Sequence, residues 1–462
     1  MLDCRSHERP RNAGGHPAVL EGTRQRPIVM RWSLLATLLA SMLIAVSSVG
    51  TFAATPRTYY VDCSGGNDAY AGTATTTAWR SLVKANGATL APGDSLLLRR
   101  GCTWTGPLKV KWVGTVIQPI RIGAYGSGEL PKIQNHYDNV DITGSHLIIE
   151  NLFARADAPT YDSGCQNARA GWRVGFRFRS GAAYNTLRYS RADDLYAGAF
   201  LSSGSHHNRV MYNRFSNNNM KSADVASDAG AIGIDIAGDD NEIAYNAISG
   251  SDACSRWFGG RDGSAISIFG GQRNSIHHND AWENNNFIEF GHSRSSDTIV
   301  AYNKVGSTLK IATFLVTRGA SDYYGPVART RAYNNTAYLT GSSAYAIQCG
   351  GGCGPGILTF KNNVVWSEDR IGYADAAFDE SNNIYWKSNG APKIYFPISS
   401  TSRRANPSFV NVRTWDFRLA AGSPGIDAGT IESVNRGFTR DFGGDAVPLG
   451  AGVDIGMDEY RD

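Results

Sequence analysis

The fold is decided by a stretch that reads Asp228-Ala-Gly-Ala-Ile-Gly-Ile-Asp-Ile-Ala-Gly-Asp-Asp-Asn-Glu-Ile-Ala-Tyr-Asn246. A Gly-bounded apolar segment, Ile232–Ile236, is followed by a polar turn and then by a second short apolar segment headed by Asn241. The next unit, Asp262–Asn279, has the same order of features. Apolar segments of four or five residues between Gly and Asn are typical of short strands.

The same unit recurs along the middle of the chain. Its second strand is headed by Asn185, Asn208, Asn241 and Asn274, and by Asp297 in the last unit. Successive headers lie 23, 33, 33 and 23 residues apart. Repeated short strands without a helical period predict an all-β solenoid, in which equivalent Asn side chains form an internal ladder that satisfies backbone groups. The Asn runs at 217–219 and 284–286 suit corners that need left-handed backbone angles.

The composition favours β structure and a partner of low charge. Gly accounts for 52 of the 462 residues, 42% of the residues are hydrophobic, and only 19% are charged. An average chain has about 7% Gly and about 25% charged residues. The formal net charge is +4, and most of it lies in the first 54 residues. These values exclude a disordered chain and predict that the protein does not bind nucleic acid.

Residues 1–54 have the features of a leader. Met30-Arg31 precedes an apolar run, Ser33–Val46, which is followed by small residues. This order is typical of a signal peptide, with Met30 as the expected true start. The alternative is a transmembrane anchor, for which the run is short. We expect a secreted or periplasmic protein with no membrane association after cleavage of the signal.

Cysteine usage agrees with export. Six cysteines follow the leader, an even number that predicts disulfides in an oxidising compartment. Cys349 and Cys353 are close enough to pair, and Cys63 can reach Cys102. Because no His flanks these pairs, we expect no metal there.

Both ends of the mature chain carry further motifs. They are Tyr59-Tyr-Val-Asp62, Gly66-Asn-Asp68, Ala78-Trp-Arg-Ser-Leu82, Pro92-Gly-Asp94, Arg100-Gly-Cys-Thr-Trp104, Pro119–Gly126, Ser423–Gly429 and Asp454–Gly456. Together they resemble the first and last coils of secreted right-handed parallel β-helix proteins, the pectate-lyase-like carbohydrate-active group. The resemblance implies this fold over nearly all of the mature chain. It leaves the reaction open, because the group contains lyases, hydrolases, epimerases and proteins that are not enzymes.

The resemblance and the repeat predict four regions. We expect a leader and signal peptide at 1–54, an N-terminal cap and first coils at 55–135, a parallel β-helix at 136–400, and C-terminal coils with a tail at 401–462.

Alternation along the strands predicts which side chains leave the solenoid. In Ile232–Ile236 we expect the Ile side chains to point inward and Asp235 to point outward. The same reasoning places Ser267 and Glu289 outside. The remaining outward residues, which we expect to bind substrate, are Arg177, Arg179, Arg318 and Gln348.

Asp235 and Glu289 are the leading catalytic candidates. Coils stack at about 4.8 Å, so backbones two coils apart lie roughly 9–10 Å from each other. Side chains that lean together or apart then cover the roughly 5–5.5 Å separation of retaining glycosidases and the roughly 6.5–9.5 Å separation of inverting ones. One carboxyl can protonate the leaving oxygen while the other activates water or attacks carbon. The alternative is that both are solvated strand residues.

Asp228 and Asp262 form a second candidate pair, because each begins the same phrase one coil apart. Two like charges roughly 5 Å apart need compensation. Ca²⁺ would supply it, with Asp224 or Asn219 as a further ligand, and would indicate a lyase with Lys221 or an Arg as base. Otherwise the pair is the acid and base of a hydrolase, or each Asp caps its corner by accepting backbone hydrogen bonds.

Aromatic and His side chains near these strands predict a sugar groove. His292 follows Glu289 by three residues and can orient a sugar, and Trp257 is among the loop aromatics on which sugar rings can pack. We therefore expect a monomeric, secreted, polysaccharide-degrading enzyme, a glycoside hydrolase without a cofactor. The alternatives are a Ca²⁺-dependent uronate lyase and a non-catalytic glycan-binding or adhesion solenoid.

Overall fold

Strands make up almost all of the regular structure in the part of the chain that the structure describes. The computed structural model describes residues 55–157, 172–221, 230–255 and 260–461. The predicted leader, 1–54, lies outside them, and Thr55–Asp462 forms a single unit. The helical elements of the described residues are α1 (Leu82–Gly87), η1 (Thr75–Thr77), η3 (Val412–Thr414) and η4 (Val434–Arg436).

Three long sheets contain most of the strands. Sheet A consists of β1 (Thr58–Val61), β2 (Ser95–Arg99), β5 (Ile120–Tyr125), β8 (Leu147–Glu150), β11 (Thr186–Arg188), β14 (Arg209–Met211), β17 (Glu242–Ala244), β22 (Ser275–His277), β25 (Ile299–Ala301), β28 (Thr330–Tyr333), β31 (Leu358–Lys361) and β34 (Asp379–Ser381). Sheet B consists of β3 (Thr103–Thr105), β6 (Lys132–Asn135), β9 (Phe153–Ala156), β12 (Arg191–Asp193), β15 (Arg214–Ser216), β18 (Ala247–Ser249), β23 (Asp280–Trp282), β26 (Lys304–Ser307), β29 (Thr336–Leu339), β32 (Val364–Ser367) and β35 (Ile384–Trp386). Sheet C consists of β4 (Leu108–Val110), β7 (Val140–Ile142), β10 (Val174–Phe178), β13 (Ala197–Leu201), β16 (Ile232–Ile236), β21 (Ser264–Phe269), β24 (Asn286–Gly291), β27 (Thr313–Arg318), β30 (Tyr345–Gly350), β33 (Arg370–Ala374) and β36 (Lys393–Tyr395).

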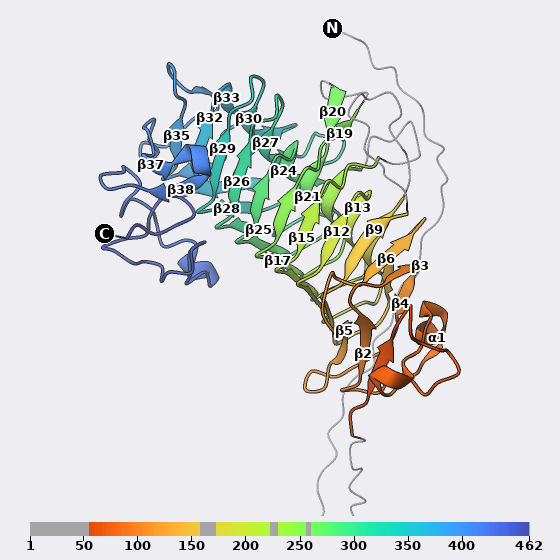
Figure 1. Ribbon diagram of the computed structural model, residues 1–462. Coiled ribbons are helices and arrows are strands. Elements are labelled where there is room, and N and C mark those ends of the chain that lie inside the picture. The colour runs from red at the N-terminus through yellow and green to blue at the C-terminus, as the bar shows by residue number, and fades with distance from the viewer. Residues whose placement is uncertain (1–54, 158–171, 222–229, 256–259, 462) are drawn as a thin grey trace, which may run out of the picture. The chain divides into compact units, whose positions relative to one another are not determined.

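The chain visits the three sheets in turn, so that each circuit forms one coil of a parallel β-helix (Figure 1). Neighbouring strands within each sheet are parallel, as in β16 with β21 and β21 with β24. Two short antiparallel pairs lie outside the three sheets. They are β19 (Ala253–Cys254) with β20 (Arg261–Asp262), and β37 (Phe409–Asn411) with β38 (Asp416–Leu419). The all-β solenoid predicted from the repeat is confirmed.

Stacked apolar side chains fill the interior between the sheets. On sheet C, Ile234, Ile266 and Ile288 pair in register and are fully buried in the main core. Ile236 belongs to this core as predicted. The inward prediction for Ile232 is wrong, because Ile232 packs in a separate small cluster that includes Tyr196. Strict alternation therefore fails at the start of β16.

Two ladders of buried Asn side chains connect the coils at the corners that flank sheet A. In the first, the backbone N–H of Asn208 donates to Oδ1 of Asn241, and that of Asn241 donates to Oδ1 of Asn274, both at 2.9 Å. The second ladder consists of Asn213, Asn246, Asn279, Asn303, Asn335, Asn363 and Asn383. The predicted ladder is confirmed. It satisfies corner backbone groups that no neighbouring strand reaches.

The left-handed backbone angles mostly lie one residue before the ladder Asn. Tyr245, before Asn246, has φ 56°, and Asp240, before Asn241, also has φ 56°. Within the Asn runs at 217–219 and 284–286, positive φ occurs only at Asn217. The ladder residues Asn208, Asn241, Asn246 and Asn279 themselves do not have positive φ. The prediction of left-handed angles in those runs is thus right for one residue.

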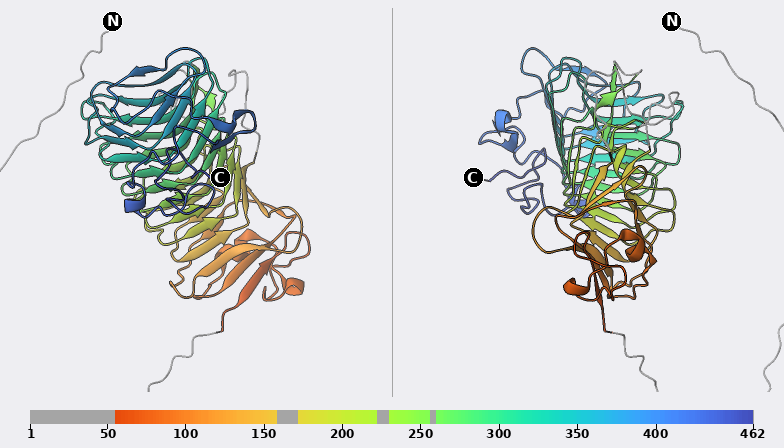
Figure 2. Two further views of the ribbon diagram at one scale, coloured as in Figure 1. Left: turned by 90° about the vertical axis from the view of Figure 1, so that its left-hand side faces the viewer. Right: turned by 45° about the vertical axis from the view of Figure 1, so that its right-hand side comes forward.

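The C-terminal segment packs back against the corner between sheets A and B (Figure 2). His278 Nε2 lies 3.2 Å from the carbonyl oxygen of Arg440, and the hydroxyls of Tyr302 and Ser433 are 2.9 Å apart. Asn334 donates to the carbonyl oxygen of Asp454 at 2.9 Å. The corner side chains of the later coils are therefore covered, whereas those of the earlier coils face solvent.

Two of the expected disulfides are present. Cys63 pairs with Cys102 across 5.7 Å between Cα atoms, and Cys349 pairs with Cys353 across 5.5 Å. Among the described residues, none of the helices has the length and apolar character needed to cross a membrane.

Candidate functional site

The outer face of sheet C carries one side chain from each coil in an unbroken row. Strand register gives the order Lys109, Asp141, Arg177, Phe200, Asp235, Ser267, Glu289, Val316, Gln348, Tyr373 and Tyr395. The structure thus places Asp235, Ser267 and Glu289 on one face, in the order predicted. Asp235 and Glu289 are two strands apart, so their backbones are separated by roughly 9–10 Å.

Asp235 is almost completely buried although its row faces outward. Its exposed fraction is 8%, and burial raises the pKa of its carboxyl to about 6. A hydrogen bond from the Ser267 hydroxyl and the charge of Arg177 oppose this increase, whereas the charge of Glu289 adds to it. A carboxyl with this pKa holds a proton in mildly acidic solution and can deliver it to a leaving group.

Aromatic side chains that the sequence interpretation missed form the wall beside Asp235. Phe200 is its neighbour in register, and the guanidinium carbon of Arg177 lies 4.5 Å from the centre of the Phe200 ring. Tyr196 is 2% exposed, and burial together with the charge of Asp235 raises the pKa of its hydroxyl. Trp172 lies 4.5 Å from Tyr196 between ring centres and is 46% exposed. Alternation in Ala197–Leu201 would have identified Phe200, but nothing local singles out Tyr196.

Glu289 is held by an ion pair. Nη2 of Arg318 lies 2.6 Å from its Oε1, and the Ser264 hydroxyl is 3.4 Å from its Oε2. Arg318 also donates to the carbonyl oxygen of Phe290 and lies 5.6 Å from the centre of the Tyr324 ring. The prediction that Arg318 belongs to this face is consistent with its position. Its contact with Glu289 comes from a neighbouring strand and could not be predicted from alternation.

The two arginines predicted on β10 have different environments. Arg179 is committed to two carboxylates, Asp141 at 2.6 Å and Asp138 at 2.5 Å. Arg177 lies 3.6 Å from Asp138, and its buried Nε has no hydrogen-bond partner within the described residues. Arg177 thus makes one longer contact with Asp138 and packs on the Phe200 ring, whereas Arg179 is held by two carboxylates.

The other predicted site residues are spread around this face. Gln348 is exposed, two strands beyond Glu289. His292 is exposed at the end of β24 and accepts a hydrogen bond from the backbone N–H of Arg294 at 3.1 Å. Asp262, in β20, accepts the N–H of Gly263 at 2.8 Å, which agrees with the capping alternative. Asp228 and Trp257 lie outside the described residues.

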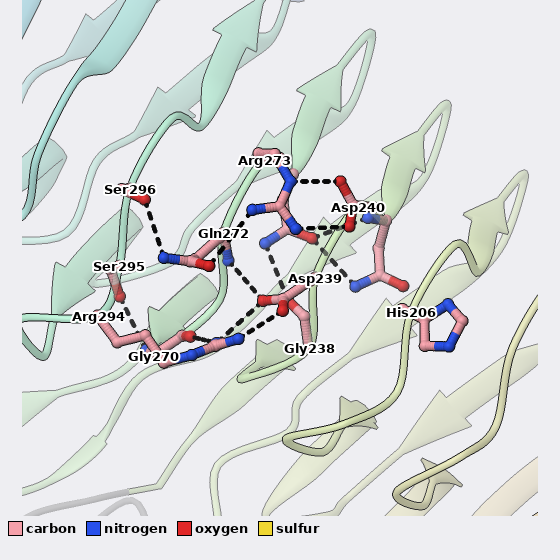
Figure 3. A network of polar contacts seen from close by, with 12 residues as sticks. His206, Gly238, Asp239, Asp240, Gly270, Gln272, Arg273, Arg294, Ser295 and Ser296 are labelled. Atoms are coloured by element: carbon pink, nitrogen blue, oxygen red, sulfur yellow. Dashed lines mark hydrogen bonds and ion pairs between the residues drawn. The ribbon is translucent and has the colours of Figure 1, made fainter. Parts of the chain in front are cut away.

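A network of paired charges lies at the corner between sheets C and A, next to the same strands (Figure 3). We call it the corner network and define it as Asp239, Asp240, Gln272, Arg273 and Arg294. Arg294 pairs with Asp239 at 2.5 Å, and Arg273 binds both oxygens of Asp240 at 2.7 and 2.8 Å. The backbone N–H of Gln272 donates to Asp239 at 3.0 Å. These carboxylates are already compensated by the neighbouring coils.

The described residues of the sheet C face do not match the needs of a Ca²⁺ ion. Asp235 and Glu289 are separated by a complete strand, and Glu289 is bound to Arg318. The one group of three close potential ligands in the described residues is Asp62, Cys63 and Cys102, two of which form a disulfide. Asp224 and Asp228 of the predicted Ca²⁺ site lie outside the described residues, so that site stays a prediction.

Comparisons with known proteins give one local and several global similarities. No protein-family model matches the chain. The lacto-N-biosidase of Bifidobacterium longum subsp. longum is 42% identical over 79 residues, which are 16% of this chain and 5% of that protein. The crystal structure of the GH136 lacto-N-biosidase from Eubacterium ramulus is 14% identical, with a TM-score of 0.48 over 75% of this chain and 67% of that chain.

Pectate lyase Pel9A is the most informative of these structures for the fold. Its crystal structure is 16% identical and has a TM-score of 0.53 over 88% of this chain and 97% of that chain. The likeness extends over nearly all of the described coils. Together with the three parallel sheets, it shows that this chain folds as a right-handed parallel β-helix.

Proposed function

We propose that this protein is a glycoside hydrolase that cleaves a polysaccharide or oligosaccharide bound on the outer face of sheet C. The observation that supports it is the contrast between two carboxyls on one face. Burial raises the pKa of Asp235 to about 6, whereas Glu289 is ion-paired with Arg318 at 2.6 Å. A general acid must be protonated while its partner, a base or nucleophile, is ionised. Two carboxyls in different environments can meet both requirements.

In this proposal Asp235 protonates the glycosidic oxygen as the bond to the leaving sugar breaks. Glu289 either removes a proton from the attacking water or attacks the anomeric carbon itself. The charge of Arg177 moderates the increase in the pKa of Asp235, and the ring of Phe200 limits access of water to Asp235. The local identity to a lacto-N-biosidase, a glycosidase by name, supports hydrolysis.

A lyase is the second candidate, and one feature of the site favours it. Arg177 places a guanidinium on the same face as Asp235. A guanidinium can bind a uronate carboxylate and stabilise the negative charge that develops there when a base removes the neighbouring proton. The fold likeness to pectate lyase Pel9A is compatible with either reaction.

The experiment that tests the proposal measures two products at once. The purified protein is incubated with polygalacturonate, alginate, rhamnogalacturonan, xylan and a lacto-N-biose-containing oligosaccharide. A hydrolase raises reducing ends without an ultraviolet-absorbing unsaturated product, and a lyase gives both. We expect reducing ends alone, lost in Asp235→Asn. An unsaturated product would contradict the hydrolase proposal and support the lyase. If none of the substrates is cleaved, both proposals are contradicted.

We also propose that the protein is exported. The disulfides Cys63–Cys102 and Cys349–Cys353 require an oxidising compartment to persist. Fractionation of the producing cells with detection of the protein tests this, and retention in the cytosol would contradict it.

A further inference from the structure

Beyond the carboxyl pair, the row on sheet C ends in exposed tyrosines. After Glu289 the row continues through Val316, Gln348, Tyr373 and Tyr395. Val316 is 6% exposed, whereas Tyr373 is 50% and Tyr395 is 56% exposed. The row thus changes from a buried position to an amide and two aromatic rings that face solvent.

These two tyrosines differ from the exposed tyrosines at the corner between sheets A and B. There, Tyr212 stacks on Tyr189 at 5.6 Å and on Tyr245 at 4.9 Å between ring centres, so the ring faces contact each other. Tyr373 and Tyr395 have no stacked aromatic partner among the described residues. Their ring faces remain available to a ligand, and their hydroxyls can bond polar groups at its edge.

The position of these rings relative to Asp235 and Glu289 indicates what kind of ligand they would contact. Tyr373 lies three strands beyond Glu289 and Tyr395 four, which correspond to about 14 and about 19 Å at about 4.8 Å per strand. A sugar at the carboxyl pair cannot reach that far, but an oligosaccharide that follows the row can. Gln348 lies between and offers an amide to sugar hydroxyls.

We propose that Gln348, Tyr373 and Tyr395 form a distal glycan-binding strip, so that the protein binds an extended glycan chain along the axis of the solenoid. This inference rests on the proposed function, because it extends the same binding face. The strip holds sugar units several positions away from the cleaved bond. It therefore makes binding depend on chain length and leaves the chemical step to Asp235 and Glu289.

The strip is tested by affinity electrophoresis in gels that contain polygalacturonate, alginate, rhamnogalacturonan or xylan. All variants carry Asp235→Asn and Glu289→Gln, so that the polymer is not cleaved during the run. We expect the background protein to be retarded by at least one polymer. Adding Tyr373→Ala and Tyr395→Ala should raise the apparent Kd about five- to thirtyfold, the range of one or two Tyr truncations at a binding surface.

Matched variants separate a loss of binding from a loss of structure. Tyr70→Ala removes a tyrosine of similar exposure, 45%, outside the three sheets and should not change retardation. Tyr395→Ala alone affects only the last strand of sheet C and should weaken binding in the same direction by a smaller factor. Tyr373→Phe with Tyr395→Phe keeps the rings and should retain most of the binding.

The outcomes distinguish the strip from the proposed reaction. The strip proposal is contradicted if the double Ala variant is retarded as strongly as Tyr70→Ala. It is also contradicted if no polymer retards the background protein. Weakened retardation supports the strip even if the wild-type protein cleaves none of the polymers, in which case the hydrolase proposal fails alone. If the wild-type protein cleaves a polymer but the double Ala variant is retarded as strongly as the background protein, the hydrolase proposal stands and the strip proposal is wrong.

Discussion

The outer face of sheet C and the corner network carry carboxylates from the same short run of sequence. Asp235 on sheet C is buried, whereas the carboxylates of the corner network are paired with arginines. Asp235 lies on β16, and Asp239 and Asp240 follow four and five residues later. Asp239 and Asp240 each meet an Arg from a following coil. Asp235 instead has Phe200 and Ser267 as its neighbours in register.

This difference shows which of the charges is uncompensated. The hydrogen bond from Arg273 lowers the pKa of Asp240, whereas burial raises the pKa of Asp235 to about 6. A paired carboxylate on a corner stabilises the stack of coils. A buried carboxyl whose burial is not offset by an ion pair costs stability and is retained where chemistry needs it.

The largest expected effect is on activity. Asp235→Asn and Glu289→Gln should each lower kcat/KM by about 10² to 10⁴, the contribution of a positioned acid or base. Asp240→Asn, the matched change at the corner, should alter kcat/KM by less than about twofold, because a surface ion pair contributes little. Reducing-end assays on the cleaved polymer measure all three. Equal losses in Asp240→Asn and Asp235→Asn would contradict the division between the two regions.

Removal of the cation beside Glu289 should have the next largest effect. Arg318→Gln leaves Glu289 without its 2.6 Å ion pair and should lower kcat by about ten- to a hundredfold. Arg273→Gln removes an arginine from the corner network instead and should leave kcat unchanged. Steady-state kinetics of both variants, with thermal unfolding to verify folding, test this. An unchanged kcat in Arg318→Gln would show that the ion pair only holds the strands together.

The activity should depend on pH through Asp235. A general acid must be protonated, so kcat/KM should fall about tenfold per pH unit once the pH rises well above the pKa of about 6. Replacement of Glu289 by Gln should leave this limb in the residual activity, but Asp235→Asn should remove it. A pH profile that stays flat between pH 6 and 9, tested with the wild-type enzyme, would contradict the assignment of Asp235 as the acid.

Replacement of Asp235 should raise the stability of the protein although it lowers the activity. The folded-state pKa of Asp235, about 6, exceeds its ordinary value of 3.8, so between these values the folded state binds more protons. The wild-type protein therefore loses stability as the pH rises from about 4 through 6. Asp235→Asn should raise the free energy of unfolding by about 1–3 kcal/mol at pH 7 and by nothing near pH 3. Denaturant unfolding at both pH values measures the difference, and a destabilised variant at pH 7 would count against burial of an ionised Asp235.

The smallest effect is expected at the corner. Asp240 has a side chain that is 26% exposed, and its pairing with Arg273 is reached by solvent and salt. Asp240→Asn should lower the free energy of unfolding by no more than about 1 kcal/mol. High salt should reduce that difference further. A loss of several kcal/mol in the same unfolding assay would show that the corner network is a main support of the solenoid.

Local sequence patterns were enough to predict the solenoid, the Asn ladder and the outward row of sheet C. Gly-bounded strands and recurring Asn headers require stacked coils, because only an equivalent Asn in the next coil satisfies the corner amides of Asn208 and Asn241. The period of two along a strand then places Asp235 and Glu289 outside. It failed at Ile232, where the start of β16 departs from simple alternation.

Which of the outward charges are paired depends on the packing of coils that are distant in sequence. The arginine partners of Glu289, Asp239 and Asp240 are 29 to 55 residues away, and no local pattern specifies which Arg reaches which carboxylate. The raised pKa of Asp235 likewise depends on burial by side chains from other coils. Local periodicity sets the direction of a side chain, but its solvation and its counter-charge are set by the packing of one coil on the next.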